Sequence, residues 1–254
     1  MQILVTYAVE AEFAPWRRLR DLEKVQIGGA EVHRAQVGRA MVDFLVTGMG
    51  ARNAHGAVEA VLSKEYSFCI VAGFAGALKP SVKLGDVIAA KKVVNDGAGG
   101  TELCARNLWT RAIGDGAKAV ETLLTADHVV NTAEEKARLA PFGEAVDMES
   151  FAILSVARSK KVSALVIRVI SDAFDRDMPV DIDTMVDAKG NVRLGGVVRY
   201  VAQHPLVVPA LLRLGRDSKT AAQALANFLE AYIKKLSFAT HGWPPPELQE
   251  VAAS

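Results

Sequence analysis

The sequence contains little cysteine, little net charge and no long apolar run, and each shortage excludes a class of protein. Only Cys69 and Cys104 occur among the 254 residues, too few for a disulfide scaffold and without metal-ligand spacing. A formal net charge of +1 gives no electrostatic reason to expect a nucleic-acid partner. No stretch is long enough for a membrane span, and the N-terminus lacks the features of a signal peptide. We therefore expect a cytoplasmic protein with no membrane span.

Apolar runs that alternate with helical patterns indicate the fold class. Half of the residues are apolar and 23% are charged, an ordinary globular composition. Apolar runs predict strands at 2–6, 41–47, 68–73, 86–90 and 164–171, and the spacing of apolar residues predicts helices at 51–64 and 148–159. Gly-containing turns between short β segments in 25–47 predict an antiparallel meander. The sequence therefore predicts an α/β protein with a mixed central β-sheet flanked by helices.

The C-terminal third supplies the predicted domain boundary and a predicted lid. Residues 217–236 form an amphipathic pattern with Asp217 or Ser218 as a plausible helix N-cap. We therefore expect one domain over 1–236, followed by a Pro-rich tail over 237–254. The charged, Gly-containing segment 174–204 follows the predicted strand 164–171 and is typical of a lid.

Acidic residues lie where several predicted strands end. Glu10 and Glu12 follow the first strand, and Ser171-Asp172 ends the run "VIRVIS". Glu149 follows a short apolar strand in "AVDMES" (145–150). Ligands of open α/β sheets bind beyond the carboxyl ends of the strands. We therefore expect these side chains to converge on one rim.

Each of these carboxylates also has an ordinary structural interpretation. Glu12 and Glu149 suit the first turn of a helix, and Asp172 suits an N-cap after Ser171. Taken together, three carboxylates on one side of a sheet suit the cleavage of a glycosidic bond, which needs an acid at the leaving group and negative charge near the sugar.

Five motifs in order carry a resemblance to a known family. They are "TYAVEAEF" (6–13), "TGMGARNA" (47–54), "AGFAGALKPSVKLGDVI" (72–88), "VDMES" (146–150) and "RVISDAFD" (168–175). The chain resembles the nucleoside phosphorylase and nucleosidase superfamily, and within it the methylthioadenosine/S-adenosylhomocysteine nucleosidases. The resemblance implies a phosphorylase/hydrolase-like α/β domain, a purine nucleoside as the small-molecule partner, and a homodimer or larger assembly.

The resemblance also implies roles for individual residues. Asp172 is expected to protonate the leaving purine, Glu149 to bind the ribose 2′-hydroxyl and stabilise the cationic sugar, and Glu12 to activate the attacking water. The expected substrate-binding residues are Met148, Val129, Val130, Phe74, Gly76, Arg168 and Ser171.

The identity of the nucleophile leaves alternatives open. Glu12 stands where phosphorylases of this family carry a phosphate-binding loop, and a carboxylate there repels a dianion, which favours water. A phosphorylase with a phosphate site built from Arg52 and Arg168 is the alternative, and the run 204–229 resembles hopanoid-associated members that act on an adenosyl lipid. Phe74 replaces a small polar residue of the family pattern, which leaves an inactive nucleoside-binding protein as a third possibility.

Overall fold

The computed structural model describes residues 1–97, 99–178 and 208–238, and its described strands form one mixed sheet of ten strands. The strands are β1 (Gln2–Tyr7), β2 (Glu23–Ile27), β3 (Ala30–Val37), β4 (Ala40–Val46), β5 (Phe68–Ala77), β6 (Val87–Asn95), β7 (Thr101–Leu103), β8 (Lys118–Thr125), β9 (Ala145–Asp147) and β10 (Ser163–Asp172). The predicted mixed α/β architecture is confirmed.

Part of this sheet closes on itself. The strand order is β10-β6-β8-β9-β5-β1-β4-β3-β2, with β7 beside β6, and β10 also pairs with β5. The five strands from β10 to β5 therefore form a ring. β1, β4, β5 and β10 run parallel to their neighbours in the order β4-β1-β5-β10. The predicted meander is confirmed as the antiparallel β2, β3 and β4.

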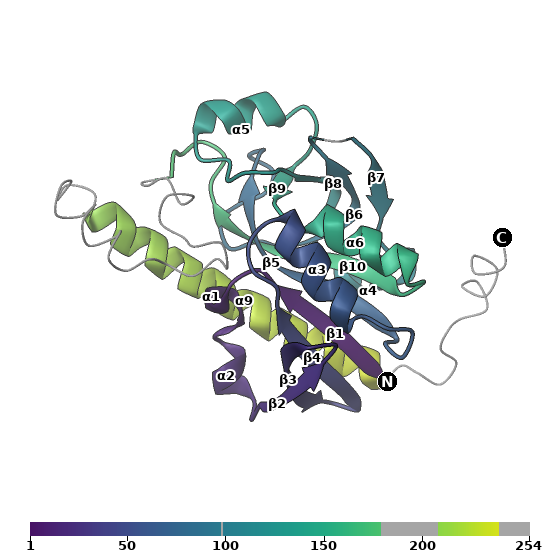
Figure 1. The fold of residues 1–254 in the computed structure, drawn as a ribbon. Coiled ribbons are helices and arrows are strands. Elements are labelled where there is room, and N and C mark those ends of the chain that lie inside the picture. Colours follow the sequence, from purple (N-terminus) through teal and green to yellow (C-terminus); the bar gives the residue numbers. More distant parts are fainter. Residues whose placement is uncertain (98, 179–207, 239–254) are drawn as a thin grey trace.

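Helices cover the sheet on both sides. Within the described ranges they are α1 (Glu10–Phe13), α2 (Trp16–Leu19), α3 (Ala51–Val61), α4 (Arg106–Gly114), α5 (Ala133–Leu139), α6 (Ser150–Ser159) and α9 (Val208–Phe238). Figure 1 shows α3 and α6 in front of the sheet and the long α9 running behind it.

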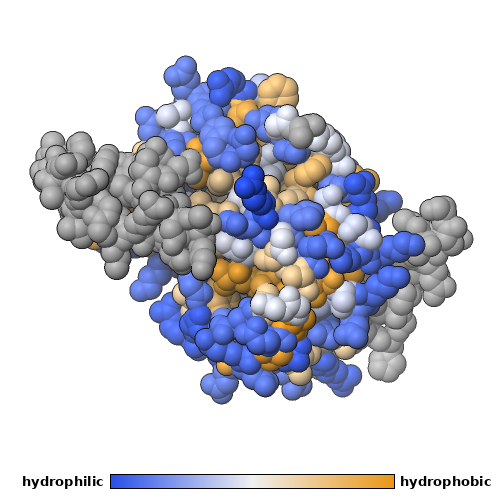
Figure 2. Space-filling model, in the orientation of Figure 1, coloured by the Kyte–Doolittle hydropathy of each residue, from blue (hydrophilic) through white to orange (hydrophobic). Residues whose placement is uncertain are grey.

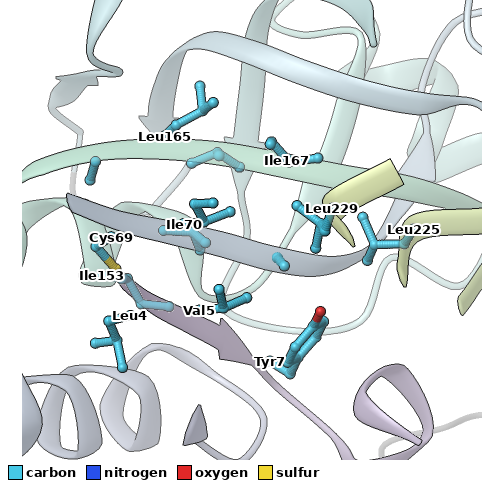
Figure 3. Close-up of a cluster of buried hydrophobic side chains, with 14 of the residues drawn as sticks. Leu4, Val5, Tyr7, Cys69, Ile70, Ile153, Leu165, Ile167, Leu225 and Leu229 are labelled. Atoms are coloured by element: carbon cyan, nitrogen blue, oxygen red, sulfur yellow. The ribbon is translucent and has the colours of Figure 1, made fainter. Parts of the chain in front are cut away.

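The core lies around β5, which is central and buried on both faces. Strands buried on both faces read as continuous apolar runs, which is why "FCIVAG" could be recognised in the sequence. Figure 3 shows Leu225 and Leu229 of α9 directed at this strand from one side, with Ile153 of α6 near Cys69 on the other. Burial raises the pKa of the Cys69 thiol to about 12, so it stays protonated.

Two predicted helix starts are wrong. α9 begins at Val208 rather than at Asp217 or Ser218, and Pro209 lies in its first turn, where a missing N–H costs nothing. Helix α6 begins at Ser150 with Glu149 as its N-cap, so Met148 precedes the helix.

The C-terminal predictions fall mainly on residues outside the described ranges. Helix α9 extends to Phe238, two residues past the predicted boundary of the tail, and residues 239–254 are not described. Of the predicted lid at 174–204, only residues 174–178 are described. No helix in the described part of the chain is long and apolar enough to cross a membrane. Figure 2 shows a mainly hydrophilic face with apolar residues gathered near its middle.

Candidate active site

A cavity of about 420 Å³ lies where the carboxyl ends of β1, β5 and β10 meet the β9–α6 connection. Every predicted site residue except Arg168 lines it: Glu12, Phe74, Gly76, Val129, Val130, Met148, Glu149, Ser171 and Asp172. Ala8 and Val9 after β1, Met49 after β4, Met178, and Leu214 and Ser218 of α9 complete much of the wall. Residues far apart in the sequence therefore converge on one edge of the sheet, as we predicted from the positions of the strand ends.

Glu12 is held rigidly at this cavity although it is only 3% exposed. Its Oε2 accepts hydrogen bonds from the backbone N–H groups of Ala8 (2.8 Å) and Val9 (3.0 Å), and its Oε1 accepts one from Phe74 (2.7 Å). Burial raises the pKa of the Glu12 carboxyl, while the charge of Arg168 and the three backbone donors act in the opposite direction. A carboxyl that is buried and aimed by fixed donors suits a general base.

Gly73 permits this close packing between β1, β5 and β10. Its φ of +147° lies in the region that favours glycine. A Cβ at this position would lie 2.3 Å from Arg168 Nη1 and 2.7 Å from Glu12 Oε1. The glycine of "AGFAG" is therefore required by the side chains that approach its backbone.

Arg168 lies behind the cavity, not in its lining. Its side chain is 1% exposed, and Nη2 lies 2.5 Å from Asp147 Oδ2, 3.0 Å from Ser150 Oγ and 3.7 Å from Glu149 Oε2. Burial lowers the pKa of the guanidinium, but the nearby carboxylates outweigh it and the net shift is upward. Arg168 therefore supplies a fixed positive charge next to the carboxylates of the site.

Glu149 occupies the N-cap of α6 and is 5% exposed. Its Oε1 accepts a hydrogen bond of 2.8 Å from the N–H of Gly50, which has a φ of +85°. Burial, with a further contribution from Asp147, raises the pKa of Glu149 to about 7, although Arg168 opposes the shift. Its charge therefore changes near neutral pH.

Asp172 ends β10 opposite Gly76, where the register between β10 and β5 is irregular. A Cβ on Gly76 would lie 3.0 Å from Asp172 Oδ2, so the glycine leaves room for the carboxylate. Ser171 Oγ donates to Asp172 Oδ1 at 3.0 Å. The ammonium of Lys136, on α5, lies 2.5 Å from Asp172 Oδ2.

His128 adds a further titratable group beside Val129 and Val130. Its ring nitrogens lie 2.6 Å from Asp127 Oδ1 and 3.0 Å from Glu135 Oε1. Hydrogen bonds to these carboxylates raise the pKa of the imidazole, against a smaller opposing effect of burial. Both nitrogens are thus committed to neighbouring carboxylates.

The arginines considered as phosphate ligands are not arranged for that role. Arg52 is exposed at the start of α3 and does not line the cavity. Arg168 is committed to Asp147. Among the described residues, no group of three or more His, Cys, Asp or Glu side chains is arranged to hold a metal ion.

Sequence reasoning missed several groups of this site. Asp147 and Ser150 hold Arg168, and Asp147 had a signal, because it is a second carboxylate at the end of β9 in the quoted motif "VDMES". No sequence pattern indicated the backbone donors of Gly50 and Phe74 or the buried Lys136.

The site can perform acid–base chemistry on a ligand the size of the cavity. Glu12, Glu149 and Asp172 all reach one cavity from different elements, and each has a different set of partners. Carboxyl groups in distinct environments can take different protonation states at one pH, which is what paired acid and base catalysis requires.

Comparisons with known proteins identify the family and the fold. A family model described as the phosphorylase superfamily matches residues 2–199. Among solved structures, the fold is similar to a Helicobacter pylori 5′-methylthioadenosine/S-adenosylhomocysteine nucleosidase and to a Helicobacter pylori futalosine hydrolase. Each has a TM-score of 0.71 and 18% identity, with 92% of this chain and 98% of the other covered. A Neisseria meningitidis 5′-methylthioadenosine/S-adenosylhomocysteine nucleosidase, solved with methylthio-immucillin-A, has a TM-score of 0.70 and 19% identity over 92% of this chain and 99% of its own.

Proposed function

Because the chain belongs to the phosphorylase superfamily, we propose that it is a purine nucleosidase that hydrolyses the N-glycosidic bond of a 5′-modified adenosine. The products are adenine and a ribose derivative. The observation that carries this proposal is that Asp172, Glu149 and Glu12 line a single cavity. One cavity allows the three carboxyl groups to act on the base, the sugar and the attacking water of the same bound molecule.

In this proposal Asp172 contacts the departing base and passes it a proton, while Val129 and Val130 pack beside the base. Glu149 accepts a hydrogen bond from the ribose 2′-hydroxyl and stabilises the positive charge that develops on the sugar. Met148 packs against the ribose. The nearby Ser171, Gly76 and Phe74 shape the wall around the linkage.

Glu12 takes the proton of the attacking water. Arg168 helps to position this water indirectly, through Glu12. The cationic guanidinium, anchored by Asp147, keeps Glu12 able to ionise despite its burial. As water attacks the anomeric carbon, the glycosidic bond breaks and its electron pair leaves with the base. The water proton goes to Glu12, and the base receives its proton from Asp172.

Hydrolysis is favoured over phosphorolysis by the charges of this site. Glu12 would repel a phosphate dianion, and the charge of Arg168 is already paired. Met49, Met178 and Leu214 in the cavity lining suit an apolar 5′ group. We further propose a cytoplasmic homodimer or larger assembly that acts without a metal or organic cofactor.

The test is adenine release from a panel of 5′-substituted adenosines, with and without inorganic phosphate. We expect release that does not depend on phosphate, and Asp172→Asn should lower it by at least about 100-fold while ligand binding persists. Strict phosphate dependence would instead establish a phosphorylase. Tight binding with no released adenine would establish an inactive binding protein in which Phe74 fills the nucleophile position.

A further inference from the structure

One nitrogen of Arg168 lies near two carboxylates and makes a hydrogen bond to only one of them. Nη2 lies 2.5 Å from Asp147 Oδ2 but 3.7 Å from Glu149 Oε2, which is too far for a hydrogen bond. The second partner of Nη2 is the hydroxyl of Ser150, which accepts at 3.0 Å. A terminal nitrogen of a guanidinium carries a pair of N–H groups, so Asp147 and Ser150 together use both of them.

Both partners of Nη2 are themselves held in place. Asp147 Oδ1 accepts a hydrogen bond of 2.8 Å from Thr125 Oγ1, and Thr125 Oγ1 accepts one of 3.1 Å from the N–H of Phe151. Ser150 is the first residue of α6 and is 0% exposed. These contacts join the ends of β8 and β9 to the start of α6, so a fixed network orients the guanidinium.

This arrangement leaves one carboxylate oxygen of Glu149 without a hydrogen bond. Its Oε1 accepts from the N–H of Gly50 at 2.8 Å, whereas its Oε2 accepts no hydrogen bond from the described part of the chain. Glu149 lines the cavity. An unused carboxylate oxygen can accept a hydrogen bond from a ligand hydroxyl, and such a charged acceptor binds more strongly than a neutral one.

We propose that Ser150 is a positioning residue that keeps Glu149 Oε2 available to a ligand hydroxyl by accepting the second N–H of Arg168 Nη2. This inference rests on the proposed function in one respect, which is that Glu149 binds the ribose 2′-hydroxyl. Without the Ser150 hydroxyl, a buried N–H of Arg168 is left unpaired, and a small shift brings it to Glu149 Oε2. A cation bonded to this oxygen competes with the ligand for the carboxylate and weakens the bond to the hydroxyl.

The experiment compares the binding of 5′-deoxyadenosine with that of 2′,5′-dideoxyadenosine, which lacks only the 2′-hydroxyl. Calorimetry is done on the Asp172→Asn protein, in which slow hydrolysis leaves the ligands intact, at pH 8, where Glu149 is mainly ionised. We expect this parent protein to prefer the 2′-hydroxylated nucleoside by at least about tenfold. Addition of Ser150→Ala should lower the preference by at least about threefold, because Glu149 is then shared with Arg168.

Ser159→Ala, in the same Asp172→Asn protein, is the matched control. Ser159 ends α6, its Oγ donates to Val156 O at 2.8 Å, and it does not line the cavity. Loss of this hydroxyl should leave the preference at its parent value. If Ser150 only stabilised the start of α6, the two affinities would fall together and their ratio would not change. An unchanged ratio in folded Ser150→Ala therefore overturns the inference.

A second variant keeps the inference falsifiable if Ser150→Ala does not fold. Ser150→Cys is close to serine in shape, but its sulfur is a weak acceptor, so it should also lower the preference. A folded Ser150→Cys protein that keeps the full preference overturns the inference.

The titration of Glu149 gives an independent readout. The charged groups that face it are Arg168 on β10, Asp147 on β9 and Glu12 on α1. If Arg168 bonds to Glu149 in Ser150→Ala, the pKa of Glu149 falls, and the loss of stability that accompanies its ionisation moves to lower pH. A pH profile of urea unfolding identical to that of the parent would contradict this shift.

The outcomes separate this inference from the proposed function. A parent protein that binds both nucleosides equally overturns the inference, because Glu149 then makes no bond to the 2′-hydroxyl. A parent that binds neither nucleoside contradicts both proposals. If the preference depends on Ser150 but the wild-type chain releases no adenine, only the proposed function fails.

Discussion

The guanidinium of Arg168 and the carboxylate of Asp147 meet at 2.5 Å, and each side chain is 1% exposed. This pair is the electrostatic centre of the site, because Glu149 and Glu12 also lie within the influence of the same cation. When one partner of a buried ion pair is removed, the other is left as an uncompensated buried charge, which destabilises the fold.

Removal of either partner is therefore expected to destabilise the fold strongly. Arg168→Met and Asp147→Asn should each lower the free energy of unfolding by about 3–5 kcal/mol, and the double variant should lose less than the sum. Urea unfolding measures these values. Lys91→Met is the control, because Lys91 pairs with Glu121 at an exposed site and should cost less than about 1 kcal/mol. Equal losses for Arg168→Met and Lys91→Met would contradict this assignment.

Gly73 should not tolerate any side chain. Gly73→Ala places a Cβ 2.3 Å from Arg168 Nη1 at a positive φ, so we expect a loss of at least about 2 kcal/mol in the free energy of unfolding. Gly56, in the middle of α3, has open space around its Cβ position, and Gly56→Ala should stabilise the protein by about 0.5–1 kcal/mol. Thermal and urea unfolding distinguish the two. A harmless Gly73→Ala would mean that Arg168 and Glu12 do not pack as described.

Glu149 should make the stability of the fold depend on pH. Its pKa rises from 4.5 to about 7 on folding, so the folded state holds a proton that the unfolded state has released between these values. The contribution of Glu149 to stability is therefore fully present below pH 4.5 and is lost as the pH rises through 7, by at most about 3 kcal/mol. Glu149→Gln keeps an acceptor for Gly50 and should show a smaller decline between pH 5 and pH 8 in urea unfolding. An identical decline in both proteins would assign the titration to another group.

Glu12 should be sensitive even to its nearest uncharged analogue. In Glu12→Gln one side-chain oxygen becomes an NH₂ group that faces a backbone N–H donor, and the base for water is lost. We expect adenine release to fall by at least about 100-fold. Glu121→Gln, at an exposed pair on β8, is the control and should retain its rate. A Glu12→Gln protein that folds and turns over at a near-normal rate would exclude Glu12 as the base.

Much of this fold could be predicted because the buried strands are continuous apolar runs. The runs at 2–6, 41–47 and 164–171 correspond to β1, β4 and β10, and the family match confirms the superfamily that the motifs indicated. Helix α5 was not predicted, although Thr132 and Glu135 form a recognisable N-terminal signature in which Thr132 Oγ1 accepts from the Glu135 N–H at 3.2 Å. The start of α9 was misplaced because Gly215 and the cap-forming Asp217 read as a helix boundary.

The site was predictable where a strand end places a residue, and unpredictable where tertiary packing does. Glu12, Glu149 and Asp172 follow strands, so the topology alone brings them to one rim. Lys136 lies in the charged pattern "AEEKARL", which is typical of a solvated helix face. Its burial is decided by the segment after β10, which is distant in the sequence and leaves no periodic signal. The catalytic roles of Glu12, Glu149 and Asp172 stay predictions until the variants are measured.

The ring formed by β10, β6, β8, β9 and β5 also limits how the protein can self-associate through its backbone. A closed ring offers no lateral row of unpaired N–H and C=O groups to an incoming strand. Among the described strands, only β2 and the three-residue β7 have a side without a partner strand. Glu23 and Lys24 place exposed charges on β2, which opposes the addition of a second chain there. The half of the sheet that supplies most of the cavity is thereby protected from amyloid-like growth.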